Sequence, residues 1–145
     1  MTNAIKTTNT TSSPSITPAF GRLLMAAIFI LSGIGKVAAP AATIGYIAST
    51  GLPFATLGFA AAVAVELGGG ILLAVGYQTR LVATVMALFS IVTALIFHHA
   101  FGDQNQMIHF LKNVAIAGGL LQVVAFGAGA FSIDARAPKL NAQAA

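Results

Sequence analysis

The chain contains four long runs of apolar residues, at positions 18–39, 54–76, 81–101 and 108–131, separated by short polar segments. Each run reaches the roughly 20 residues that an α-helix needs to cross the hydrocarbon core of a bilayer. The runs lack the period-two alternation of β-barrel strands, and Ala, Leu and Gly dominate over β-branched residues. The pattern therefore predicts an all-α membrane protein, a bundle of four transmembrane helices.

The polar segments predict how the chain is divided. Residues 40–53, between the first two spans, are uncharged and carry an apolar stripe with Tyr46, which favours a short segment at the membrane interface. We expect residues 1–16 to form a disordered polar tail, residues 17–135 the transmembrane domain and residues 136–145 a polar C-terminal tail. A cleaved signal peptide is the alternative for the first run, but a long polar tail precedes it.

Composition supports a bilayer as the main partner. Hydrophobic residues make up 57% of the 145 positions and charged residues 7%, whereas a soluble domain carries about 25% charge. The net charge of +4 does not indicate nucleic-acid binding, because the basic residues occur singly at the ends of apolar runs. The chain has no cysteine, which excludes disulfides, thiol catalysis and Cys-ligated metal centres. Any redox role would need a bound cofactor or a partner protein.

The basic residues also predict an orientation. Most of them fall on one side of the predicted bundle: Lys6, Arg22, Arg80, Arg136 and Lys139. By the positive-inside rule, both termini should face the cytoplasm. Arg22 and Arg80 are then expected to anchor span ends at the headgroups, with an inward contact as the alternative.

Three charged residues lie within the apolar runs: Lys36, Glu66 and Lys112. A charge at the centre of a transmembrane helix costs about 2.5–3.5 kcal/mol on insertion scales, so these side chains should face the bundle interior and meet one another. Glu66 lies about 18 Å along its helix, near the bilayer midplane. The sequence leaves open whether Glu66 pairs with Lys36 or with Lys112.

Other polar side chains should gather near these charges. His98 ends the third span, and His109, Lys112 and Asn113 share one turn of the fourth. Together with Lys36 and Glu66 they predict a polar pocket that suits a small anion or the carbonyl oxygens of a quinone. A purely structural ion pair is the main alternative. A metal or haem between His98 and His109 is disfavoured, because no metal-binding spacing occurs on one helix.

Several short motifs occur in an order that resembles the DoxX family of small four-helix bacterial inner-membrane proteins. They are Ser32-Gly33-Ile34-Gly35-Lys36, Thr50-Gly51-Leu52-Pro53, Glu66-Leu67-Gly68-Gly69-Gly70, Thr79-Arg80 and Phe110-Leu111-Lys112-Asn113. The ending at residues 129–134 resembles the YqjF-like branch of that family. The resemblance covers residues 20–134.

The resemblance implies a membrane component of redox chemistry, since relatives include subunits linked to quinol oxidation, thiosulfate–quinone oxidoreduction and oxidative-stress defence. It also implies that Lys36, Glu66, Arg80, Lys112 and Asn113 occupy the family's recurring polar positions. The absence of cysteine departs from any thiol-based mechanism and argues against an oxidoreductase acting unaided.

Three functions follow as hypotheses. The first is a membrane subunit that binds a quinone or small anionic ligand and supports a redox partner protein. The second is a structural or assembly protein, which could also form a homo-oligomer, whose charges only hold the bundle together. The third is a small transporter; four short spans argue against an alternating-access carrier unless the chain dimerises.

Overall fold

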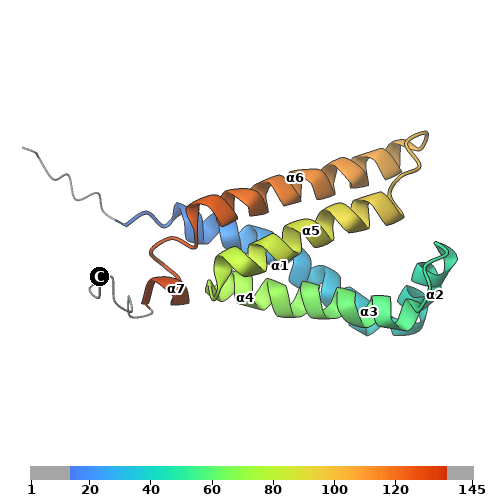
Figure 1. Cartoon of the computed structure of the whole chain (residues 1–145), viewed down its shortest axis with the longest axis horizontal. Coiled ribbons are helices and arrows are strands. Elements are labelled where there is room, and N and C mark those ends of the chain that lie inside the picture. Colours follow the sequence, from blue (N-terminus) through green and yellow to red (C-terminus); the bar gives the residue numbers. More distant parts are fainter. Residues whose placement is uncertain (1–13, 137–145) are drawn as a thin grey trace, which may run out of the picture.

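A computed structural model describes residues 14–136 of the chain (Figure 1). The predicted tails at 1–16 and 136–145 lie almost entirely outside this part. Within it, four helical stretches are long and apolar enough to cross a membrane: Thr17–Ala38, Ala55–Val75, Thr79–Phe97 and Gln104–Phe126. The prediction of an all-α protein with four spans is confirmed.

The elements follow one another without a strand in the described residues. In chain order they are α1 (Thr17–Ala38), α2 (Pro40–Ser49), α3 (Ala55–Val63), the π-helical segment η1 (Ala64–Gly69), α4 (Gly70–Val75), α5 (Thr79–Phe97), α6 (Gln104–Phe126) and α7 (Ile133–Arg136).

The spans form two antiparallel pairs (Figure 1). Helix α1 packs along α3, η1 and α4, and α5 packs along α6. The pairs approach each other at the end that holds α7 and the α4–α5 turn, called the terminal end below. They diverge toward the opposite end, called the α2 end, which holds α2 and the α5–α6 connection.

Glycines let the second span approach the helices on either side of it closely. A Cβ on Gly70 would lie 2.8 Å from Ile30 Cγ1 of α1, and a Cβ on Gly69 would lie 3.1 Å from Met86 Sδ of α5. In lipid, helices associate through such close packing rather than through the hydrophobic effect. The glycine run after Glu66 therefore lets the second span fit between α1 and α5.

The second span is not one continuous α-helix. Residues 64–69 form the π-helical turn η1, which carries Glu66. A π-turn holds one extra residue and changes the direction of the side chains on either side of it, and such turns are frequent at functional sites. The apolar pattern predicted the length of this span but not the wide turn.

Two span ends differ from the sequence prediction. The third span ends at Phe97 rather than at residue 101, so His98 follows the helix. The fourth span ends at Phe126 rather than near residue 131, because Gly127 adopts φ 82° and the chain turns back toward α7. The predicted interfacial segment is the short helix α2, whose Tyr46 ring stacks on Phe97 of α5 with centroids 5.5 Å apart. This contact links the two helix pairs at the α2 end.

Candidate functional site

An ion pair joins the part of α1 near the α2 end to η1. Lys36 Nζ lies 2.8 Å from Glu66 Oε1 and donates a second hydrogen bond, 2.9 Å long, to Ser32 Oγ. Glu66 is only 6% exposed and faces the bundle interior. Of the two partners that the sequence left open, the structure pairs Glu66 with Lys36.

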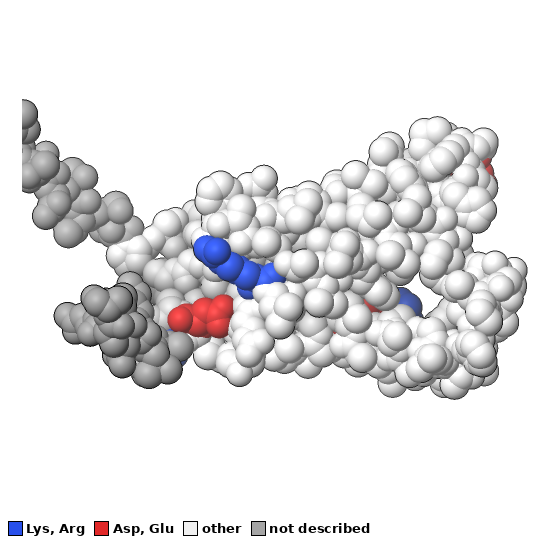
Figure 2. Space-filling model, viewed as in Figure 1, with Lys and Arg blue, Asp and Glu red and all other residues white. Residues whose placement is uncertain are grey.

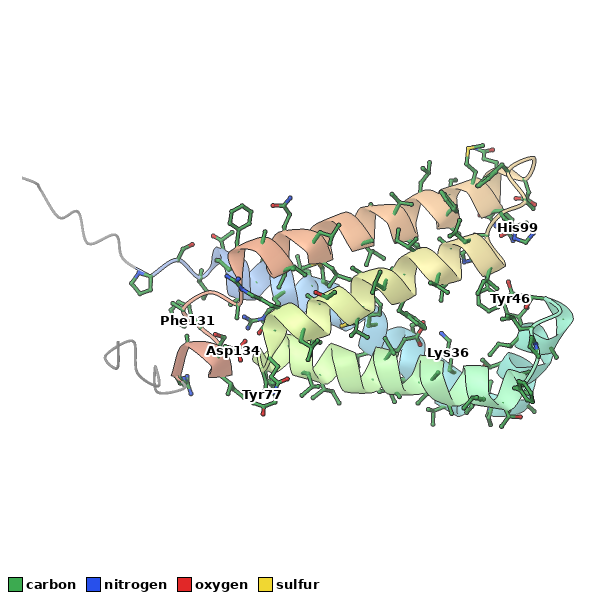
Figure 3. All side chains as sticks on the ribbon, viewed as in Figure 1. Lys36, Tyr46, Tyr77, His99, Phe131 and Asp134 are labelled. Atoms are coloured by element: carbon green, nitrogen blue, oxygen red, sulfur yellow. The ribbon has the colours of Figure 1, made fainter. Side chains whose placement is uncertain are left out.

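The Ser-Gly-Ile-Gly-Lys motif explains why this pair forms. A Cβ on Gly33 would lie 2.7 Å from the Leu67 side chain and 3.2 Å from Glu66 Cβ, so glycine lets η1 approach α1 at this level. Lys36 lies one turn beyond and extends into the space between the helix pairs (Figure 3). Ser32 fixes the ammonium from the preceding turn.

A second polar cluster lies across from the ion pair, at the α2 ends of α5 and α6. The His98 and His109 rings stack with centroids 5.1 Å apart. Lys112 Nζ lies 3.0 Å from His109 Nδ1, and His98 Nδ1 lies 3.0 Å from Gln106 Oε1. Asn113 donates to the His109 carbonyl. Since an ammonium only donates, His109 Nδ1 accepts, and the neutral ring carries its proton on Nε2.

Among residues 14–136, no group of three or more His, Asp or Glu side chains is placed to hold a metal ion.

A cavity of about 360 Å³ separates the two polar groups. Of the six predicted site residues, all except His109 line it. Charged groups are visible in the hollow between the helix pairs near the α2 end, whereas the surrounding face is almost free of charge (Figure 2). The rest of the wall is mostly apolar and includes Phe29, Ile47, Phe89, Ile96 and Ile116. Its volume falls within the range of small-molecule sites.

The cavity has a defined roof and floor. The Tyr46–Phe97 stack covers it at the α2 end. Below it the helix pairs close together, where a Cβ on Gly119 of α6 would lie 3.0 Å from Met25 Sδ of α1. Between roof and floor, Ile28 and Val92 line the cavity and are 40% and 49% exposed. The charged groups in the hollow are visible from the side of the bundle (Figure 2), so the cavity is open to the surface there.

Arg22 is buried inside the bundle instead of lying at the headgroup position expected for it. It is 2% exposed, and its guanidinium donates to the carbonyls of Ala74, Ala128 and Phe131. The carbonyl end of α4 carries unpaired acceptors and partial negative charge, which attracts the cation inward. Arg80 is exposed at the terminal end, and its role as a headgroup anchor stays a prediction.

Asp134 fastens α7 to the start of α5. Asp134 points toward the turn between α4 and α5 (Figure 3), and its carboxylate accepts hydrogen bonds of 2.8 Å from the Gln78 and Thr79 amides. Burial alone would raise the pKa of this carboxyl, but the hydrogen bonds from Thr79 and Gln78 and the charge of Arg22 lower it below its usual value. The terminal end is thus held by Arg22 and Asp134, apart from the cavity.

Sequence reasoning missed several polar residues of the cavity wall as site residues, among them two on α5. Ser90 and Thr93 of α5 line the cavity beside Glu66. Their spacing of three places both on one helix face, which was the available signal. The roof residues Tyr46 and Phe97 lie far apart in the chain, and no local pattern pairs them.

Comparisons with known proteins agree with this architecture. Residues 17–99 match the sequence model of the DoxX family. The inner membrane protein YqjF of Escherichia coli (strain K12) is 37% identical over 113 residues, which cover 78% of this chain and 85% of the relative. The inner membrane protein YphA of the same organism is 38% identical over 120 residues, covering 79% and 86%. No solved structure matches the chain.

Proposed function

This chain is a polytopic inner-membrane protein of the DoxX family, and we propose that it binds a small lipid-soluble ligand of quinone size in the cavity beside Glu66. The ligand would be used by a redox partner protein. The observation that carries the proposal is the Lys36–Glu66 pair on the wall of a cavity that is open at the side of the bundle.

Energetics favour a function for the charges. Replacing a buried ion pair by well-packed apolar side chains is often neutral or stabilising, so the pair is not needed merely to hold helices. Side chains also leave the space next to the pair unfilled, although close packing is the norm in protein interiors. A retained charge pair beside an unfilled cavity is typical of a ligand site.

Each side chain would have a distinct role toward a quinone. Lys36 and, from the opposite wall, Lys112 would donate hydrogen bonds to ligand oxygens and stabilise negative charge there. Glu66 would balance the charge of Lys36 and exchange a proton with the ligand. Apolar side chains such as Phe29 and Phe89 would contact the ring. A partner would handle the electrons, because the chain has no cysteine for thiol or cluster chemistry.

The test is quinone content after purification in mild detergent. Lipid extracts of the native chain should contain quinone, and extracts of Lys36→Met and Glu66→Gln should contain at least tenfold less. Arg80→Met is the matched control, since it removes an exposed charge far from the cavity. Equal quinone in all four proteins would remove the site assignment. Native protein that carries no quinone and binds no added short-chain ubiquinone would refute the ligand class.

The ion pair also supports a second candidate, a purely structural role, because it joins α1 directly to η1. Lys36→Met alone leaves a buried carboxylate without its partner and should lower the thermal midpoint. The double variant Lys36→Met/Glu66→Leu should regain it. If the double variant also regains the bound quinone or the biological activity, the pair is structural; if only stability returns, the ligand proposal holds.

A further inference from the structure

We propose that the cavity takes its ligand as an anion, a quinone with one ionised ring oxygen that pairs with Lys112. This inference rests on the proposed function and specifies the charge of the bound molecule. It is carried by the charged groups of the cavity wall, by their exposure and by the partners that they already have.

The charged groups that a bound molecule can reach are cationic. Lys112 is exposed and lines the cavity from α6. On the opposite wall the Lys36 side chain is 26% exposed, whereas the Glu66 side chain is 7% exposed. A ligand in the cavity therefore meets two ammonium groups, while the carboxylate is largely shielded from it.

The acidic side chains of the protein all have partners other than Lys112. There are three of them, and Glu66 forms its ion pair with Lys36. Asp103 accepts hydrogen bonds from backbone amides in the first turn of α6, and Asp134 from those at the start of α5. The pair of Lys36 with Glu66 is the one salt bridge in the described part of the chain. With neutral histidines, the cavity wall thus carries an excess of one positive charge.

Lys112 also has hydrogen-bond donors left for a ligand. An ammonium has three N–H groups, and one of them is directed to His109 Nδ1 at 3.0 Å. The ring that accepts this bond is neutral, so it does not balance the charge of the lysine. Lys112 lies about 12 Å along α6 from its start at Gln104, within an apolar span. A charge at such a position calls for a partner of opposite sign, which an anionic ligand supplies.

An ionised ring oxygen agrees with the quinone of the proposed function. A quinone with an acidic hydroxyl keeps its carbonyl oxygens, and one of these can accept the N–H of Lys36 that neither Glu66 nor Ser32 binds. The ionised hydroxyl then pairs with Lys112. A neutral quinone fits the same walls but leaves the charge of Lys112 unbalanced, so it should bind less tightly.

Two quinones that differ mainly in charge test the inference. At neutral pH, 2-hydroxy-3-methyl-1,4-naphthoquinone is an anion, whereas 2-methoxy-3-methyl-1,4-naphthoquinone has the same rings and carbonyls and is uncharged. Binding is measured by equilibrium dialysis against the full chain in phosphatidylcholine nanodiscs, with empty nanodiscs subtracted to remove partition into lipid. We expect the anion to bind roughly 10- to 100-fold more tightly, as a hydrogen bond between charged groups implies.

Variants assign the preference to the charge of Lys112. Lys112→Met should bind the two quinones equally, and so should Lys112→Gln, which keeps a hydrogen-bond donor without the charge. Lys112→Arg keeps the charge and should keep the preference. Arg80→Met is the matched control, because it removes an exposed positive charge that does not line the cavity. Thermal midpoints close to that of the native chain show that each variant is folded.

The outcomes distinguish the two proposals. If the native chain binds both quinones equally, or the uncharged one more tightly, anion recognition is wrong while the quinone cavity stands. If the folded native chain binds neither above empty nanodiscs, both proposals fail. A preference for the anion that survives in Lys112→Met and Lys112→Gln would overturn the assignment to Lys112.

Discussion

Arg22 and Arg80 occur in similar sequence contexts, but one is buried and the other is exposed. Each precedes a leucine near the terminal end of a span, and the sequence predicts the same headgroup contact for both. Arg22 faces the carbonyl end of α4 and the chain that returns after α6, so its guanidinium finds acceptors inside the bundle. The Arg80 side chain lies beside Gly127 at the surface of the bundle and stays exposed.

Replacing Arg22 should therefore destabilise the fold far more than replacing Arg80. Arg22→Met leaves several carbonyls without their donor and should lower the free energy of unfolding by about 3 kcal/mol, given about 1.5–3 kcal/mol for a hydrogen bond to a charged group. Arg80→Met should change it by less than about 0.5 kcal/mol. Denaturant unfolding in detergent measures both, and equal losses would contradict the role of Arg22.

At the scale of single residues, the candidate site could be predicted in part from the sequence. The cost of burying charge indicates that Glu66 and Lys36 face inward, and the structure brings them together. The choice between Lys36 and Lys112 depends on how each helix is rotated, and Lys112 instead contacts His109 on its own helix. A local sequence does not specify that rotation.

At the scale of elements, the glycines after Glu66 have different roles. Gly70 faces α1, whereas a Cβ on Gly68 would meet nothing within 4 Å. The apolar pattern places these glycines in one helix without distinguishing them. Gly68 and Gly70 are two positions apart, which turns their directions by about 200° on a helix, so one contacts α1 and the other faces outward.

Alanine at the two positions should give opposite results. Gly70→Ala forces a methyl group against Ile30 and should destabilise by about 1–3 kcal/mol, as overpacking of a core does. Gly68→Ala should be neutral or stabilising by up to about 1 kcal/mol, because alanine favours the helix. Thermal unfolding in detergent compares the two variants. A larger loss of stability in Gly68→Ala than in Gly70→Ala would refute the packing described for η1 and α4.

The start of α5 predicts a pH dependence of stability. The folded-state pKa of Asp134 lies below the ordinary value of 3.8, so its stabilisation is fully present above that value and is lost as the pH falls through the folded pKa. The thermal midpoint of the native chain should exceed that of Asp134→Asn at pH 7, and the difference should vanish in strongly acidic solution. A difference that does not change with pH would contradict the contact.

At the scale of the whole molecule, the diverging helix pairs create the cavity. The pairs close together around Gly69 and Gly119 and separate toward the α2 end, where the Tyr46–Phe97 stack bridges them. A bundle with parallel pairs would have brought the two polar clusters together and left no space. Divergence is a property of the assembled pairs, which no single apolar run encodes.

The topology of the whole chain can be tested through its lack of cysteine. Residues 15 and 135 lie at the terminal end, and residue 105 lies at the α2 end. With both termini in the cytoplasm, Asn105→Cys should react with a membrane-impermeant maleimide in intact spheroplasts, whereas Ser15→Cys and Ala135→Cys should react only after lysis. The reverse labelling pattern would place the termini outside.

The sequence by itself determined the number of spans, their approximate ends and the inward placement of Glu66. These features follow from bilayer thickness and from the cost of exposing charge to hydrocarbon, which act on each segment separately. The tertiary structure decided the partner of Glu66, the inward turn of Arg22, the π-turn and the cavity. These depend on helix rotation and on contacts between residues far apart in the chain, which are fixed only when the four helices pack against one another.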